Sequence, residues 1–70
     1  MTERLRNRLR QARADRGWTQ ADLAERVGVT RKTINTVENG VFTPSTVLAL
    51  KLARAFDLTV EALFQLPPDS

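Results

Sequence analysis

The fold is decided by residues 19–40, which read TQADLAERVGVTRKTINTVENG. The spacing of the apolar residues predicts two short helices here, 20–27 and 31–39. Gly28 is suited to end the first helix in a left-handed conformation, and only Val29 and Thr30 then separate it from the second. Two helices joined by so short a turn must cross at a steep angle instead of lying antiparallel.

This close crossing makes demands on individual side chains. Ala24 must be small because the second helix passes over it, and Gly28 must take a positive φ. Val29, Ile34 and Val37 must be apolar to fill the space between the helices. The sequence meets all of these requirements, and the spacing therefore predicts a helix-turn-helix motif.

The other helices follow from a repeated start signal. An apolar residue precedes a Thr, and a second apolar residue follows five positions after the first, which is the hydrophobic staple with a Thr N-cap. Asp22 can complete a capping box with Thr19, and Pro44 suits a first helical position. The pairs are Trp18/Leu23 around Thr19, Val29/Ile34 around Thr30, Phe42/Val47 around Thr43 and Leu58/Leu63 around Thr59.

These signals predict an all-α fold of five helices, in which the second and third form the helix-turn-helix. No strand is expected, because no alternating apolar run appears. The 70 residues suffice for one small domain. We assign it to residues 1–66 and expect residues 67–70 to be a frayed tail. The predicted helices are 3–16, 20–27, 31–39, 44–56 and 60–65.

The composition excludes several classes of function. The chain contains no Cys and no His, so a zinc site, a Cys nucleophile, a Ser-His-Asp triad and a haem-binding histidine are absent. We expect no metal, no cofactor and no enzymatic activity. Apolar runs fall far short of the roughly 20 residues of a membrane span, and no apolar stretch follows the Arg-rich start as in a signal peptide. We therefore expect a cytoplasmic protein.

The charge is distributed unevenly along the chain. The formal net charge is +3. Residues 1–35 hold nine Lys/Arg and four Asp/Glu, whereas residues 36–70 hold two and four. A basic half beside a mildly acidic half favours one surface that meets a polyanion.

The predicted helix 31–39 has two contrasting faces. Ile34, Val37 and Glu38 share one side, at helical spacing. The other side is polar and cationic and contains no carboxylate, which suits a helix in the DNA major groove. A solvated face of a small bundle is the alternative, but it would ordinarily mix Glu with Lys. The predicted base-contacting residues are Arg31, Lys32, Asn35 and Thr36.

Phosphate contacts are expected around that helix. Gln20 opens the first helix of the motif, where free backbone N–H groups attract anions. Such contacts fix the register on DNA but read no sequence. The predicted backbone-contacting residues are Arg10, Arg13, Gln20, Thr30, Thr33, Asn39 and Thr43.

Glu38 poses a separate problem, because it lies beside the buried Ile34 and Val37. A carboxylate that close to a core requires a cation. Arg13 is the natural candidate, and the pair would tie the first helix to helix 31–39.

Seven short motifs lie along the chain as landmarks: Arg16-Gly17-Trp18-Thr19-Gln20, Leu23-Ala24, Val27-Gly28-Val29, Thr33-Ile34, Val37-Glu38-Asn39-Gly40, Pro44-Ser45 and Leu50-Lys51-Leu52-Ala53. Through these motifs the chain resembles the lambda repressor-like, Cro/C1-type family of helix-turn-helix regulators, especially its short single-domain members. The resemblance runs from Leu9 to Phe64, about 80% of the chain.

The resemblance implies a five-helix fold and roles for several residues. Gln20 matches a phosphate contact that braces the base-reading helix, and Arg10 a basic phosphate contact. Arg31, Lys32 and Thr36 match base-contacting positions, Thr33 and Asn39 backbone-contacting ones, and Arg13 with Glu38 the buried ion pair. Phage members often carry Gln at positions 31 and 32, where this chain has Arg-Lys. The operator is therefore not transferable, and a guanine-containing half-site is the expectation.

A homodimer is expected for two reasons. One helix reads too few bases for a genome-wide search, so family members pair on two half-sites about one helical turn apart. The end of the chain also holds more apolar residues than one small core needs, although closing that core is the alternative role for them. The predicted dimer interface comprises Leu50, Val60, Leu63, Phe64 and Leu66.

Three functions remain open from the sequence. The favoured one is a sequence-specific regulator of transcription, most simply a repressor, that binds double-stranded DNA as a dimer and has no evident small-molecule effector. The alternatives are the DNA-binding antitoxin of a toxin–antitoxin pair and a protein-interaction module that has lost DNA binding. The salt dependence of binding distinguishes the protein-interaction module from the other two, because affinity for DNA falls steeply as the salt concentration rises.

Overall fold

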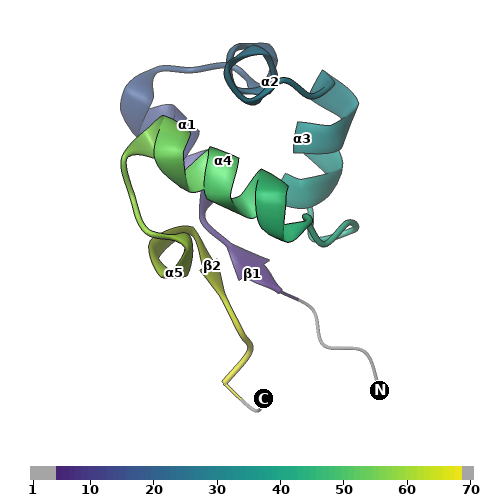
Figure 1. Cartoon of the computed structure of the whole chain (residues 1–70), viewed down its shortest axis with the longest axis vertical. Helices are drawn as coiled ribbons and strands as arrows, with labels where there is room; N and C mark the ends of the chain where they lie inside the picture. The colour runs from purple at the N-terminus through teal and green to yellow at the C-terminus, as the bar shows by residue number, and fades with distance from the viewer. Residues whose placement is uncertain (1–4, 69–70) are drawn as a thin grey trace.

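The computed structural model of the chain describes residues 5–68. Helices dominate, and the two ends of the described chain meet in a short strand pair at one end of the molecule (Figure 1). In chain order the elements are β1 (Arg6–Asn7), α1 (Leu9–Arg16), α2 (Gln20–Val27), α3 (Arg31–Glu38), α4 (Thr46–Phe56), α5 (Val60–Leu63) and β2 (Phe64–Gln65).

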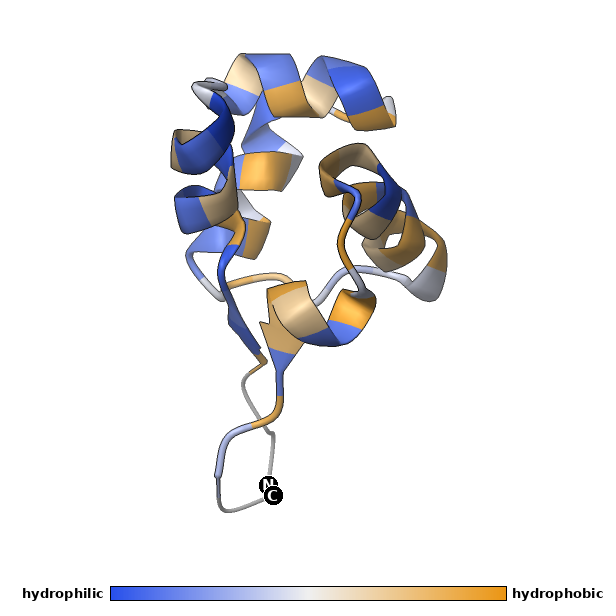
Figure 2. Cartoon of the chain, turned by 90° about the vertical axis from the view of Figure 1, so that its left-hand side faces the viewer, coloured by the Kyte–Doolittle hydropathy of each residue, from blue (hydrophilic) through white to orange (hydrophobic). Residues whose placement is uncertain are grey.

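The core lies where the apolar sides of these elements meet. Each helix carries both apolar and polar residues along its ribbon (Figure 2), and α2 packs against α3 and α4. Trp18 stacks on Phe56 with their ring centroids 5.1 Å apart. The buried residues are Leu9, Leu23, Ala24, Val27, Ile34, Val37, Leu48, Leu52, Ala53, Phe56, Leu63 and Phe64.

Three of the predicted N-caps are confirmed. Thr19, Thr30 and Thr59 each accept a hydrogen bond from the backbone N–H three residues on, and Thr19 and Asp22 form the full capping box. Each Thr hydroxyl thereby pairs with one of the N–H groups that a helix start leaves without an intrahelical partner.

The predicted start of the fourth helix is wrong by two residues. Ser45, not Thr43, is the N-cap, and its hydroxyl accepts from the Leu48 N–H at 3.1 Å. The staple expected around Thr43 does not form, because Phe42 and Val47 are both exposed. Ser and Thr are both suitable N-cap residues. The prediction relied on the apolar spacing to choose between them, and that spacing favoured the wrong residue.

The first helix is also shorter than predicted, and the expectation of no strand is wrong. Residues 6 and 7 are extended and pair antiparallel with β2, Arg6 opposite Gln65 and Asn7 opposite Phe64. The Arg8 N–H then donates to the Leu63 carbonyl at 2.8 Å. The backbone before Leu9 is thus bonded to the end of the chain instead of to a helical turn. For the same reason α5 ends at Leu63.

Parts of two predictions fall on residues outside the described range: Glu3 and Arg4 of the first helix, and Asp69 and Ser70 of the frayed tail. Within residues 5–68, no helix combines the length and apolar character that crossing a membrane requires.

Candidate nucleic-acid interface

Helices α2 and α3 form the predicted tight turn. Gly28 has φ +72°, which L side chains adopt only at a cost, and the Val29 N–H donates to the Ala24 carbonyl at 3.0 Å. Ala24 is buried at the crossing, and Ile34 and Val37 anchor α3 in the core. This anchoring turns the opposite side of α3 outward; α3 lies at the right-hand edge of the molecule in Figure 1.

The outward side of α3 carries the predicted base-contacting residues. Arg31, Lys32 and Asn35 are exposed, and Thr36 is partly buried. The Thr36 hydroxyl donates to the Thr33 carbonyl at 2.9 Å, so its hydrogen is already used within the helix. The one acidic residue of α3 is Glu38, whose side chain points inward. The exposed side of α3 is therefore cationic and amide-bearing.

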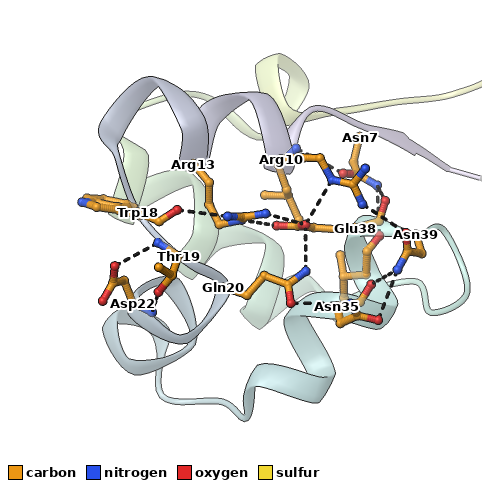
Figure 3. Close-up of polar contacts among 12 residues, drawn as sticks. Asn7, Arg10, Arg13, Trp18, Thr19, Gln20, Asp22, Asn35, Glu38 and Asn39 are labelled. Atoms are coloured by element: carbon orange, nitrogen blue, oxygen red, sulfur yellow. Dashed lines mark hydrogen bonds and ion pairs between the residues drawn. The ribbon is translucent and has the colours of Figure 1, made fainter.

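Glu38 is the centre of a polar cluster (Figure 3). Its side chain is 0% exposed. One carboxylate oxygen accepts from Arg13 Nε at 2.6 Å, and the other accepts from Arg13 Nη2 and from Gln20 Nε2, each at 3.1 Å. Arg10 Nε lies 3.7 Å from the second oxygen. These contacts join α1, α2 and α3 through one carboxylate.

The cluster shifts the acidity of its members. Burial alone would raise the pKa of Glu38, but hydrogen bonds from Arg13 and Gln20, with the charges of Arg13 and Arg10, hold that pKa below its ordinary value. The hydrogen bond to Glu38 raises the pKa of Arg13 in turn. Both groups are thus charged at neutral pH, which offsets part of the cost of burying them.

Arg13 is engaged in this pairing, and its predicted role as a phosphate contact stays a prediction. Its third donor, Nη1, bonds to the Trp18 carbonyl at 3.0 Å, and its side chain is only 15% exposed. The neighbouring Arg10 has a side chain that is 69% exposed. Of the two arginines, Arg10 is therefore the more accessible to a phosphate.

An amide chain connects the buried carboxylate to the surface. Gln20 Oε1 accepts from Asn35 Nδ2 at 3.5 Å, and Asn35 Oδ1 accepts from Asn39 Nδ2 at 3.1 Å. Asn39 Oδ1 in turn accepts from Arg10 Nη2 at 3.3 Å. Three of the predicted phosphate contacts, Arg10, Gln20 and Asn39, and the predicted base contact Asn35 therefore hold one another in place.

The remaining predicted phosphate contacts are threonines. Thr30 caps α3 by accepting from the Thr33 N–H at 3.2 Å, and the two hydroxyls lie 3.0 Å apart. Thr43 is exposed in the loop before α4. Thr30 and Thr33 thus lie together at the start of α3, with Thr43 beyond its other end.

The predicted dimer interface divides into two groups. Leu50 and Leu66 are 57% and 63% exposed, and Val60 is partly buried. Leu63 and Phe64 are 0% and 7% exposed. These two side chains fill the core of their own chain, so assigning them to the interface is wrong.

One residue of this region was not anticipated from the sequence. The Asn7 side chain bonds to the backbone at both the start of α1 and the end of α3. A polar residue two positions before the first helical residue is a weak local signal for the first contact. No sequence signal indicates the second, which spans 30 residues of chain.

Comparison with known proteins assigns the family. A sequence model described as helix-turn-helix matches residues 9–63. The chain belongs to the Cro/C1-type helix-turn-helix family. Its members are DNA-binding regulators of transcription, which is the function class of this chain.

Two relatives match this Cro/C1-type chain over most of both lengths. The uncharacterised HTH-type transcriptional regulator YgzD of Bacillus subtilis is 39% identical over 66 residues, which cover 94% of this chain and 100% of the relative. An uncharacterised HTH-type transcriptional regulator of Archaeoglobus fulgidus is 48% identical over 60 residues, 86% of each chain.

Among solved structures, the restriction-modification controller protein C.AhdI of Aeromonas hydrophila superposes with a TM-score of 0.73 at 37% identity. The match covers 77% of this chain and 82% of that protein. None of the three proteins is described as an antitoxin, so the comparisons do not favour that alternative.

Proposed function

We propose that this Cro/C1-type chain binds a pseudo-palindromic DNA operator as a homodimer, with α3 of each copy in the major groove, and represses transcription from that site. The observation that carries the proposal is the exposed side of α3. It presents Arg31, Lys32 and Asn35 outward, while its one carboxylate is buried. Arg and Lys donate to guanine O6 and N7, and Asn pairs with adenine.

The polar cluster around Glu38 supports the groove-binding geometry. Base readout requires side chains held in a defined position before DNA arrives. Glu38 fixes α3 against Arg13 of α1 and Gln20 of α2, and the amide of Asn35 is held by Gln20 and Asn39. The reading side of α3 is thus braced from within the protein.

Phosphate contacts complete the proposed footprint. Arg10 and Asn39 lie near the C-terminal end of α3, and Thr30 and Thr33 at its start. Gln20 opens α2, where the first backbone N–H groups lack intrahelical partners. Contacts to phosphates at both ends of α3 would fix its register along the groove.

The dimer is supported by apolar side chains that the fold leaves outside. Leu50 of α4 and Leu66 after β2 are large and exposed. Val60, the third residue of the predicted interface that the core does not bury fully, is partly exposed. A symmetric interface would remove this surface from water. Binding to chromosomal DNA would place the dimer in the cytoplasm.

Selection of bound duplexes from a random DNA pool tests the proposal. The expected result is a two-fold symmetric consensus with half-sites separated by one helical turn, together with affinity that falls steeply as salt rises. An asymmetric consensus would contradict binding as a symmetric dimer. The absence of any enriched sequence would contradict sequence-specific DNA binding.

A further inference from the structure

The Asn7 side chain links two helices through its two ends (Figure 3). Its Oδ1 accepts from the Leu9 N–H at 3.1 Å, at the start of α1. Its Nδ2 donates to the carbonyls of Val37 at 3.0 Å and Glu38 at 3.3 Å. An N–H lies on one side of the amide and two carbonyls lie on the other, so its orientation is determined by its partners.

The two carbonyls belong to the last two residues of α3. The final carbonyls of a helix have no intrahelical N–H to accept from, and they need donors from elsewhere. The Gly40 N–H meets this need locally for Val37, at 3.1 Å. Asn7 adds a second donor to Val37 and a donor to Glu38 from a segment 30 residues away in the chain. The bond therefore ties the backbone of α3 to α1, independently of the Glu38 side chain.

Asn7 is itself held from the opposite side. It lies in β1, opposite Phe64 of β2, and the next residue, Arg8, donates to the Leu63 carbonyl at 2.8 Å. Leu63 and Phe64 are core residues. The end of the chain thus anchors the strand that carries Asn7 against α3.

We propose that Asn7 is a positioning residue for DNA recognition, which sets the orientation of α3 in the groove by holding its C-terminal end. The inference rests on the proposed function. Without Asn7, the apolar contacts of Ile34 and Val37 and the Glu38 cluster still retain α3. The Glu38 carbonyl then loses the Asn7 donor, and the Val37 carbonyl keeps only the Gly40 N–H. A small tilt of α3 moves Arg31, Lys32 and Asn35 relative to base edges, whereas phosphate contacts tolerate it.

Two variants separate the roles of the side chain. Asn7→Ser keeps an oxygen suited to cap α1 but is too short to reach α3, and Asn7→Ala removes both contacts. A matched control is Gln65→Ala, because Gln65 Nε2 makes the same type of bond to the carbonyls of Glu61 and Ala62 at the end of α5, at 2.8 and 3.1 Å. That control removes two amide-to-helix bonds without touching α3.

The test measures Kd for a duplex selected by the wild type and for a scrambled duplex, at one salt concentration and well below the melting temperature of each variant. Asn7→Ser and Asn7→Ala are expected to lose roughly ten-fold on the selected duplex and less than about two-fold on the scrambled one. Gln65→Ala is expected to keep the wild-type ratio of the two affinities even if its melting temperature falls. If Asn7→Ser does not fold, Asn7→Asp keeps the shape and the cap without the donor, and the same loss of ratio is expected.

An unchanged ratio in the Asn7 variants would overturn the inference while leaving the proposed function intact. An equal change of the affinity ratio in Gln65→Ala would show that Asn7 has only a general structural role, which would also overturn the inference. If the wild type itself binds both duplexes equally, the proposed function fails and the inference with it.

Discussion

Arg13 and Glu38 form a bidentate ion pair that joins α1 to α3, with Nε 2.6 Å from one carboxylate oxygen and Nη2 3.1 Å from the other. The Glu38 side chain is fully buried, and Gln20 donates a further hydrogen bond to it. A buried pair is not necessarily more stable than apolar residues of equal size, but loss of one partner leaves an uncompensated charge. The pair therefore fixes how α3 sits on the domain.

Glu38→Ala is expected to lower the free energy of unfolding by about 3–5 kcal/mol, because it leaves the Arg13 guanidinium buried without a counter-charge. Urea denaturation followed by the fluorescence of Trp18, the only tryptophan of the chain, measures the change. Asp15→Ala is the matched control, since Asp15 is an exposed carboxylate in α1. Equal stability of Glu38→Ala and the wild type would show that the Arg13–Glu38 pair does not stabilise the fold.

Stability is also expected to depend on pH through Glu38. Because its pKa is lowered on folding, the carboxylate contributes stability that is fully present above the ordinary glutamate pKa of about 4.3 and is lost as the pH falls through the folded pKa. Glu38→Gln should therefore be less stable than the wild type at neutral pH, with the difference shrinking in acid.

The thermal unfolding midpoints of the wild type and Glu38→Gln, measured from neutral pH downward, check this pH dependence. The pKa of Asp22 is also lowered, by hydrogen bonds from the Thr19 backbone and side chain, so Asp22→Asn separates the contribution of the capping box. Parallel curves for the wild type and Glu38→Gln would contradict the assignment of the acid sensitivity to Glu38.

Arg10→Ala is expected to weaken binding to all DNA sequences similarly and to reduce the magnitude of the slope of log K against log salt by about 0.9, as the loss of one phosphate contact predicts. The exposed Arg54 of α4 provides a control of equal charge change. Fluorescence anisotropy at several salt concentrations measures both slopes. Identical slopes for the two variants would show that Arg10 does not meet a phosphate.

Leu50→Lys and Leu66→Lys are expected to shift the protein from dimer to monomer, because each places a charge on the proposed apolar interface. Sedimentation equilibrium measures the assembly state. Leu63→Ala is the contrasting variant, expected to cost about 2–5 kcal/mol of folding free energy as a core truncation. A lysine variant that remains dimeric would place the interface elsewhere.

Local signals explain why the helix-turn-helix could be predicted. The caps at Thr19 and Thr30 and the left-handed Gly28 depend on residues within a few positions of one another, and the structure has all of them. The cap before α4 failed because Thr43 and Ser45 offer the same chemistry two residues apart, and only packing distinguishes them.

The strand pair and the Asn7 contact could not be predicted in the same way. Arg6 and Gln65 meet across nearly the whole chain, and two-residue strands carry no alternating pattern. The burial of Leu63 and Phe64 follows from this pairing, which directs the end of the chain back onto the core. The same long-range contact displaces the start of the first helix.

If the exposed side of α3 reads base sequence, Arg31→Ala and Lys32→Ala each weaken recognition of the selected duplex. Each variant is compared with the wild type on the selected and the scrambled duplex by anisotropy titration. The expected loss is about 1–3 kcal/mol per variant on the selected duplex and much smaller on the scrambled one. Equal losses on both duplexes would mean that these side chains contact phosphates only and that α3 does not read base sequence through them.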